Sequence, residues 1–295
     1  MYDHVPSGWP MPSTRRFRGG VTVATFPGWQ AKHSITVVAP HGQANVIGSA
    51  EPTPREAADF AAVQARQMRT DFPSWVEDRF HRASAFGLPG WERQFRWTPP
   101  DGMPIRQVQR YAVLRGYGAT MTATAPDSAF DQSAEAMRTI MDSFELAVDD
   151  GTARLAADPA DGWLVRESVQ YTLADGSANV IMSSEPLAGD LTLAGDLTLA
   201  AYAGVQGELL AREFAGYEQL GYERVPVLGL ADGFRRRFTW TPVNGVPVTQ
   251  VQLYALDGGR GVTATATTPS TAVGTNMGGL ERLLDALRYD PPAPG

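Results

Sequence analysis

A long internal repeat constrains the fold of this chain more than any other feature of its sequence. Residues 28–52 match a later part of the chain at an offset of 134, and residues 94–126 match at an offset of 143 without a gap. Local propensity cannot produce matches of this length, so the chain is predicted to be one unit used twice. A length of 295 residues agrees with two domains, which we place at residues 17–148 and 152–290.

The two offsets differ by nine residues, and the extra residues lie between the matching blocks. The second unit carries AGDLTLAGDLTL at residues 188–199, a stretch of six residues written twice. We interpret it as a local duplication that extends a loop or the start of a helix. Residues 149–161, rich in Asp, Ala and Gly, are the predicted linker, and the first strand of the second unit is expected within it, around Thr152–Ala156.

Hydrophobic periodicity predicts the same order of elements in each unit. In the first unit, Thr53 is placed to cap the helix that is expected from residue 55. The order is three strands, a helix, three or four strands and a helix, which indicates an α+β fold with an antiparallel sheet flanked by helices. In the first unit the expected strands are 21–26, 34–38, 44–49, 90–98, 105–114 and 118–125, and the expected helices are 55–70 and 127–144.

Composition excludes several classes of function. The formal net charge is −7, so the chain lacks the clustered positive charge that binds nucleic acid. It contains no cysteine, which excludes disulfides, thiolate metal sites and a lipid anchor on an N-terminal cysteine. The N-terminal residues contain no apolar stretch of signal-peptide length, and no run approaches a membrane span of ~20 residues. These features predict a cytoplasmic protein without stable membrane insertion.

The sequence resembles a known family at three runs of residues. They are FRGGVTVATFPGWQAKHSITVVAP, then ANVIGSAEP, and then RQFRWTPPDGMPIRQVQRYAVL. These runs are similar to DcrB-like proteins of the PsbP-like fold, and the likeness extends over nearly the whole chain, twice. Within that group the chain looks most like the Eag chaperones of bacterial type VI secretion, whose pattern includes a Gly-Trp pair and a Gln-x-Gln-x-Tyr strand.

The resemblance implies a non-enzymatic chaperone that binds and shields hydrophobic, transmembrane-like helices of a secreted effector before export. It implies no cofactor and no metal. The family members resemble one unit and act as homodimers, so the fused chain is expected to be a monomer that acts as an intramolecular pseudo-dimer with two-fold symmetry. The chain departs from the pattern at the insert of the second unit and at Trp91, which is matched by Phe234.

Candidate partner-binding residues lie on the Gln-x-Gln-x-Tyr strands. Alternate side chains of a strand share one face, so the two glutamines and the tyrosine of each copy project together. Such a face can contact a helix through apolar surface while its amides offer hydrogen bonds; alternatively, it is a polar stripe that faces solvent. With apolar residues of the preceding strands, the candidates are Gln107, Gln109, Tyr111, Gln250, Gln252, Tyr254, Ile35, Val37, Val169 and Tyr171.

Nothing in the sequence argues positively for catalysis. All four histidines lie in the first half of the chain and lack a histidine counterpart in the second half, and none has the spacing of metal ligands. The chain lacks glycine-rich phosphate loops and the GxSxG pattern of serine hydrolases. A hydrolase or transferase is the third hypothesis, without a motif in its favour. The alternative to a chaperone is a structural or adaptor protein that binds soluble partners through its outer surface.

Overall fold

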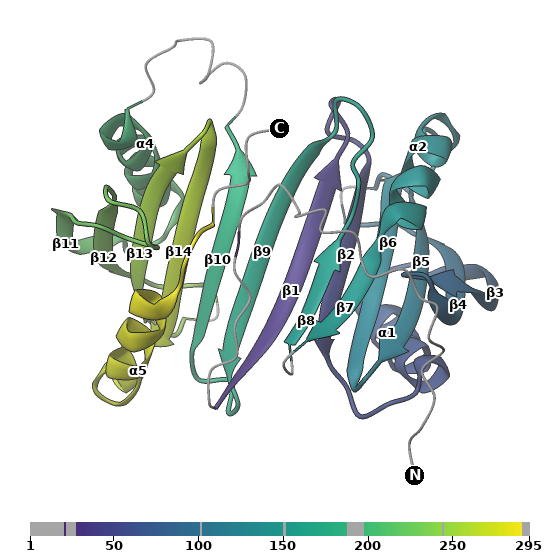
Figure 1. Cartoon of the computed structure of the whole chain (residues 1–295), viewed down its shortest axis with the longest axis horizontal. Helices are drawn as coiled ribbons and strands as arrows, with labels where there is room; N and C mark the ends of the chain where they lie inside the picture. The colour runs from purple at the N-terminus through teal and green to yellow at the C-terminus, as the bar shows by residue number, and fades with distance from the viewer. Residues whose placement is uncertain are drawn as a thin grey trace.

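The computed structural model describes residue 21 and residues 28–100, 102–149, 152–187, 198–243 and 245–290. The described strands are all antiparallel, which confirms the α+β class with an antiparallel sheet. The large sheet contains β1 (Trp29–Val38), β2 (Asn45–Pro52), β3 (Val76–Ala85), β4 (Leu88–Trp97), β5 (Ile105–Leu114), β6 (Tyr117–Pro126), β9 (Leu164–Leu173), β10 (Asn179–Pro186), β11 (Glu218–Arg224), β12 (Phe234–Trp240), β13 (Val248–Asp257) and β14 (Arg260–Pro269). The other elements are β7 (Glu145–Asp149), β8 (Thr152–Ala156), α1 (Ala57–Asp71), α2 (Phe130–Ser143), α4 (Leu199–Glu213), η1 (Ser270–Ala272) and α5 (Val273–Ala286) (Figure 1).

The large sheet is continuous through the whole molecule. Where two sheets were predicted, the described strands form one sheet of 12 strands in the order β11-β12-β13-β14-β10-β9-β1-β2-β6-β5-β4-β3. The physical reason is that β1 and β9 would each be the edge of a six-stranded sheet, and their pairing satisfies the backbone groups that such an edge leaves open. The division into domains 17–148 and 152–290 stays a prediction.

The β1–β9 junction has a symmetric register. Ser34 lies opposite Ser168, and the offset of 134 makes these two serines equivalent in the repeat. Outward from this pair the strand order is β2, β6, β5, β4, β3 on one side and β10, β14, β13, β12, β11 on the other. Equivalent strands of the two copies therefore lie at equal distances from the junction.

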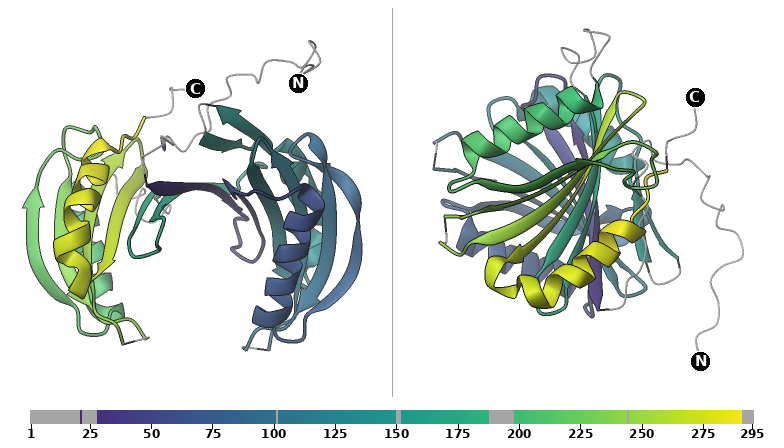
Figure 2. Two further views of the ribbon diagram at one scale, coloured as in Figure 1. Left: turned by 90° about the horizontal axis from the view of Figure 1, so that it is seen from below. Right: turned by 90° about the vertical axis from the view of Figure 1, so that its left-hand side faces the viewer.

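The sheet bends into an arch, with β1 at its crown (Figure 2, left). A Cβ on Gly48 would lie 2.1 Å from the Phe144 ring, which follows α2, and a Cβ on Gly118 would lie 2.7 Å from the Phe60 ring of α1. The strand register places Gly48 and Gly118 on opposite faces of the sheet, so α1 and α2 cover opposite faces. In the second half, α4 and α5 are divided in the same way (Figures 1 and 2).

The convex face carries the main cores. There α2 packs on β6 and β2, α5 packs on β14 and β10, and β8 packs across β1 and β2. The concave face is covered at its two ends, by α1 on β4 and β5 and by α4 on β13. The central strands on the concave side have no described helix against them in Figure 2.

Several predicted elements differ from the structure. The chain begins α1 at Ala57 after an extended Glu56, so Thr53 comes too early to cap the helix and instead accepts a hydrogen bond from the Arg55 N–H at 3.3 Å. Strands β3 and β7 were not predicted. Thr152–Ala156 is a strand as expected, but it is not the first strand of the second unit: it pairs with β7 in a separate two-stranded sheet that packs on β1 and β2. Outside the described residues lie most of the predicted strand 21–26, most of the insert, and the tail 291–295.

Candidate functional site

The centre of the concave face forms a surface of small polar side chains, which we call the central concave surface. Its residues come from six adjacent strands, and the register places them all on the side of the sheet that α1 and α4 flank. They are Lys32, Ser34, Thr36, Ile47, Ser49, Thr120, Thr122, Arg166, Ser168, Gln170, Ile181, Ser183, Thr263 and Thr265.

A row of six hydroxyl side chains crosses the middle of this surface, one on each strand. The row runs through directly paired residues and ends at a tyrosine on either side. Because serine and threonine are small, another backbone can approach this row closely. In order, the residues are Tyr111, Thr120, Ser49, Ser34, Ser168, Ser183, Thr263 and Tyr254.

Two isoleucines flank the row of hydroxyls at equivalent positions. Ile47 on β2 is 39% exposed and Ile181 on β10 is 40% exposed, although both lie in strands near the middle of the sheet. Exposed aliphatic side chains at equivalent places in a sheet centre are suited to contact an apolar partner.

Charges on the central concave surface cancel in pairs. Lys32 lies 3.1 Å from Glu51, and the equivalent residues of the second copy, Arg166 and Glu185, also lie 3.1 Å apart. Both pairs are partly exposed, so each contributes little to stability. Their effect is to leave the centre of the concave face without net charge.

Gln109 and Gln252 lie beside this surface, each held by a relay that begins at a buried arginine. Arg93 Nη1 donates to the Tyr111 hydroxyl at 2.9 Å, and that hydroxyl donates to Gln109 Oε1. Burial raises the pKa of Tyr111 to about 12, which keeps the hydroxyl protonated as a donor. Because Oε1 of Gln109 is occupied, its amide nitrogen, which bonds no other described residue, is left as a donor.

The second copy repeats this relay with one partner missing. Arg236 donates to the Tyr254 hydroxyl at 3.3 Å, and Tyr254 donates to Gln252. Burial raises the pKa of Tyr254 to about 12 as well. In the first copy Arg93 Nε also donates to Glu77 at 2.7 Å, whereas Nε of Arg236 has no partner among the described residues.

The remaining glutamines of the motif bond within the sheet. Gln107 donates to Thr124 at 2.9 Å and accepts from the Trp97 indole at 3.2 Å. Gln250 donates to Thr267 at 2.8 Å and is 9% exposed. As predicted, the two glutamines and the tyrosine of each motif share one face of the sheet, and it is the concave one.

Six candidate residues are buried and cannot contact a partner in this structure. Tyr111 and Tyr254 lie beneath α1 and α4, where their rings pack edge-on against Phe60 and Tyr202. The other four project from β1 and β9 into the cores of the convex face, because alternation puts them opposite the central concave surface. We therefore correct their assignment from partner contact to packing: Ile35, Val37, Val169 and Tyr171 are all 0% exposed.

A buried pair of polar residues at the β1–β9 junction was missed from the sequence. His33 Nε2 lies 2.9 Å from Glu167 Oε1, and His33 Nδ1 accepts from the Leu155 N–H at 2.9 Å. Glu167 Oε2 accepts from the Val21 N–H at 3.2 Å. The offset of 134 makes residues 33 and 167 equivalent. Equivalent residues can meet where two copies of a unit join, so the repeat was the signal in the sequence that could have found this pair.

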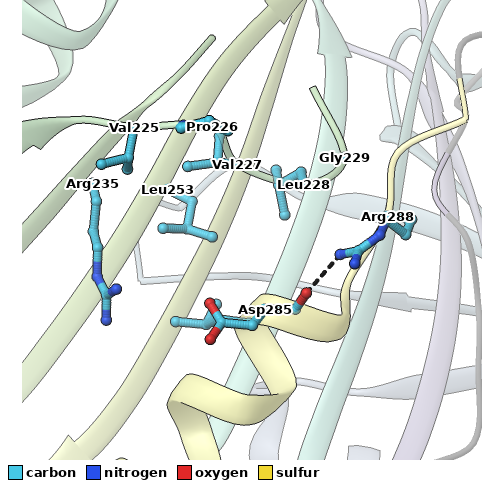
Figure 3. A pocket seen from close by; sticks show the side chains of 10 residues that line it. Val225, Pro226, Val227, Leu228, Gly229, Arg235, Leu253, Asp285 and Arg288 are labelled. Atoms are coloured by element: carbon cyan, nitrogen blue, oxygen red, sulfur yellow. Dashed lines mark hydrogen bonds between the residues drawn. The ribbon is translucent and has the colours of Figure 1, made fainter. Parts of the chain in front are cut away.

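A small cavity lies on the convex side of the second half (Figure 3). It has a volume of about 290 Å³, with Val225, Val227 and Leu253 among the apolar residues that line it. The equivalent place in the first half holds Arg110, which bonds Glu92 at 2.7 Å and Asp142 at 2.5 Å. Leu253 stands where Arg110 stands in the first half, so a leucine replaces the arginine of that ion-pair network, while Arg235 beside the cavity pairs with Glu281 at 3.0 Å.

The described residues contain neither a metal-ligand cluster nor a membrane-spanning helix. That part of the chain holds no group of three or more His, Asp or Glu side chains arranged to ligate a metal ion. Its helices are all too short or too polar to cross a membrane.

Comparison with known proteins identifies similar solved structures at low identity. The apo structure of the immunity protein TplEi of the type VI secretion system from Pseudomonas aeruginosa has a TM-score of 0.46 and 13% identity, covering 94% of this chain and 97% of that chain. A chain of the Tle4–Tli4 complex has a TM-score of 0.45 and 14% identity, with the same coverage. No protein-family model and no curated protein matches the sequence.

A third similar structure is about half as long. It is a P. aeruginosa protein of unknown function with a TM-score of 0.37 and 16% identity, and the match covers 52% of this chain and 99% of that chain. Likeness at these TM-scores does not establish function.

Proposed function

We propose that this protein is a non-enzymatic chaperone that holds an apolar helix of a secreted effector before export by a type VI secretion system. The observation that carries the proposal is the central concave surface, which the described helices leave uncovered and which exposes Ile47 and Ile181. The resemblance of the sequence to Eag chaperones supports this class of partner.

The chemistry of the surface suits an uncharged helix. The row of hydroxyls allows the helix backbone to come close, as small residues do between membrane helices. Ile47 and Ile181 supply apolar contact, and the paired charges avoid placing a net charge against an apolar partner. The free amides of Gln109 and Gln252 can donate to hydroxyl or carbonyl groups of the helix.

We infer that the protein works as a monomer in which two DcrB-like units form an intramolecular pseudo-dimer. The symmetric register at Ser34 and Ser168 supports this arrangement, because it sets equivalent residues of the two units at equal distances across one face. A partner helix of ~20 residues would be ~30 Å long and would contact both units at once.

Binding of a defined peptide tests the proposal. The probe is a fluorescent synthetic helix of 20 residues built from Ala, Leu and Gly, and the readout is fluorescence anisotropy. The double variant Ile47→Asp/Ile181→Asp should weaken binding at least about tenfold, because burying one such side chain contributes about 1.5–3 kcal/mol.

The matched control replaces exposed aliphatic side chains at the edges of the sheet instead of its centre. Val76 on β3 is 52% exposed and Leu220 on β11 is 50% exposed, both at the edges of the sheet. The double variant Val76→Asp/Leu220→Asp should bind the peptide as the unchanged protein does. Equal affinities of the Ile47→Asp/Ile181→Asp variant and the unchanged protein would reject the concave face as the binding site.

The second candidate is an adaptor that binds soluble proteins through its outer surface. The observation in its favour is that β3 and β11 are open sheet edges, to which a strand of another protein can add. β11 is exposed along its whole length, with Leu220 50% and Tyr222 41% exposed. For this candidate the variants at Val76 and Leu220 lose the partner, and those at Ile47 and Ile181 keep it.

A further inference from the structure

We propose that the β1–β9 junction is a selective interface, in which His33 and Glu167 make the first repeat accept the second repeat and reject a copy of itself. The two residues occupy one position of the repeat, since the offset of 134 makes them equivalent. A symmetric pair of identical units would bring two histidines or two glutamates together there. The duplicated chain brings one of each.

The local hydrogen bonds assign the tautomer of the His33 ring. His33 Nδ1 accepts from the Leu155 N–H, so this nitrogen carries no proton and the ring proton is on Nε2. Nε2–H then donates to Glu167 Oε1 at 2.9 Å, and Glu167 Oε2 accepts from Val21. Every polar atom of the two side chains has a partner, as buried polar groups require.

Burial makes the pair selective. His33 is 3% exposed and Glu167 is 4% exposed, so neither side chain can turn to solvent if its partner is changed. Two carboxylates in this place would repel in a medium of low dielectric, and two neutral imidazoles facing the same N–H donors would leave ring nitrogens without partners. A Glu–Glu pair and a His–His pair would therefore both destabilise the junction, and protein interfaces reject wrong partners through such unfavourable contacts.

Exchange of the two residues should preserve the bonds. A glutamate at position 33 can accept from the Leu155 N–H, and a histidine at position 167 can accept from the Val21 N–H while donating across the junction. Arg260 lies on the Glu167 side, and the charge of Glu167 partly offsets the lowering of the Arg260 pKa by burial. The exchanged pair therefore restores most of the wild-type stability, and the presence of Arg260 keeps it from restoring all.

The first test measures urea unfolding of the full chain at pH 8. His33→Glu and Glu167→His should each lower the unfolding midpoint, and the double exchange H33E/E167H should recover most of the loss. His81 is the control, because it is about one-third exposed and 3.9 Å from Glu92. An uncharged replacement, His81→Gln, should leave the midpoint nearly unchanged. A double exchange that is no more stable than the single variants would overturn the proposal.

The second test measures selectivity directly. H33E carries two glutamates at the junction and E167H carries two histidines, so two exchanged chains can form two matched junctions in trans. When equal amounts are unfolded together and refolded, native mass spectrometry should find a 1:1 heterodimer that neither variant forms alone. Folded monomers of both variants with no heterodimer would show that the pair does not choose partners.

Discussion

Gln219→Glu should stabilise the protein by giving Arg236 the carboxylate that Arg93 already has. Arg93 is 3% exposed and donates from Nε to Glu77 at 2.7 Å, whereas Arg236 is 4% exposed and its Nε has no partner among the described residues. Glu77 lies opposite Phe95 and Gln219 lies opposite the equivalent Phe238, each just before a β-bulge. A carboxylate at position 219 is therefore expected to face Arg236 as Glu77 faces Arg93.

A hydrogen bond to a charged group contributes about 1.5–3 kcal/mol. Because position 219 is exposed, we discount this to about 1–2 kcal/mol for Gln219→Glu. The assay is equilibrium urea unfolding, with a higher midpoint and an unchanged slope as the expected result. Glu77→Gln is the matched opposite change and should lower the free energy of unfolding by a similar amount.

The double variant Glu77→Gln/Gln219→Glu should unfold close to the unchanged protein, because the two sites lie in different halves and distant effects add. The reasoning is refuted if Gln219→Glu leaves the midpoint where it was while Glu77→Gln lowers it. That result would mean that Arg236 gains nothing from a carboxylate at this place.

Three further predictions concern packing, pH and surface charge. Gly48→Ala should cost about 1–3 kcal/mol in urea unfolding, because its Cβ would lie 2.1 Å from the Phe144 ring; a variant as stable as the unchanged protein would contradict the packing described. The pKa of Tyr111 is raised to about 12 by burial, so the stability it contributes is complete below pH ~10 and is lost as the pH rises to 12. The melting temperature of Tyr111→Phe should fall less steeply over this pH range than that of the unchanged protein. Equal slopes for the two proteins would contradict the raised pKa of Tyr111. Lys32→Met should change the free energy of unfolding by less than about 1 kcal/mol, since its ion pair with Glu51 is partly exposed; a larger loss would show that this pair is not a solvated one.

The faces of the central strands could be predicted from sequence, because strict alternation fixes which side chains share a side. Gln109 and Tyr111 share a face as predicted. Alternation does not say which face a helix covers, so it could not show that Tyr111 lies beneath α1 while Gln109 lies beside the open surface. That distinction depends on where α1 packs, which is a long-range contact.

The elements that were missed lack the patterns on which prediction depends. Strand β3 reads VEDRFHRASA and is an edge exposed on most of its length, so no apolar alternation marks it. The buried roles of Arg93 and His33 were also missed, because charged and polar side chains usually lie on the surface. Their partners Tyr111 and Glu167 are distant in sequence and meet only through strand pairing.

The β1–β9 junction lies within one polypeptide, and this has a consequence for how the protein responds to dilution. An arch made from two separate chains would fall apart as the protein became scarce, because its assembly would depend on the amount of each chain. Joining the halves by a short connection fixes their effective concentration at a level on the order of millimolar, whatever the abundance in the cell. A protein built in this way presents its complete concave face even when only a few copies are made.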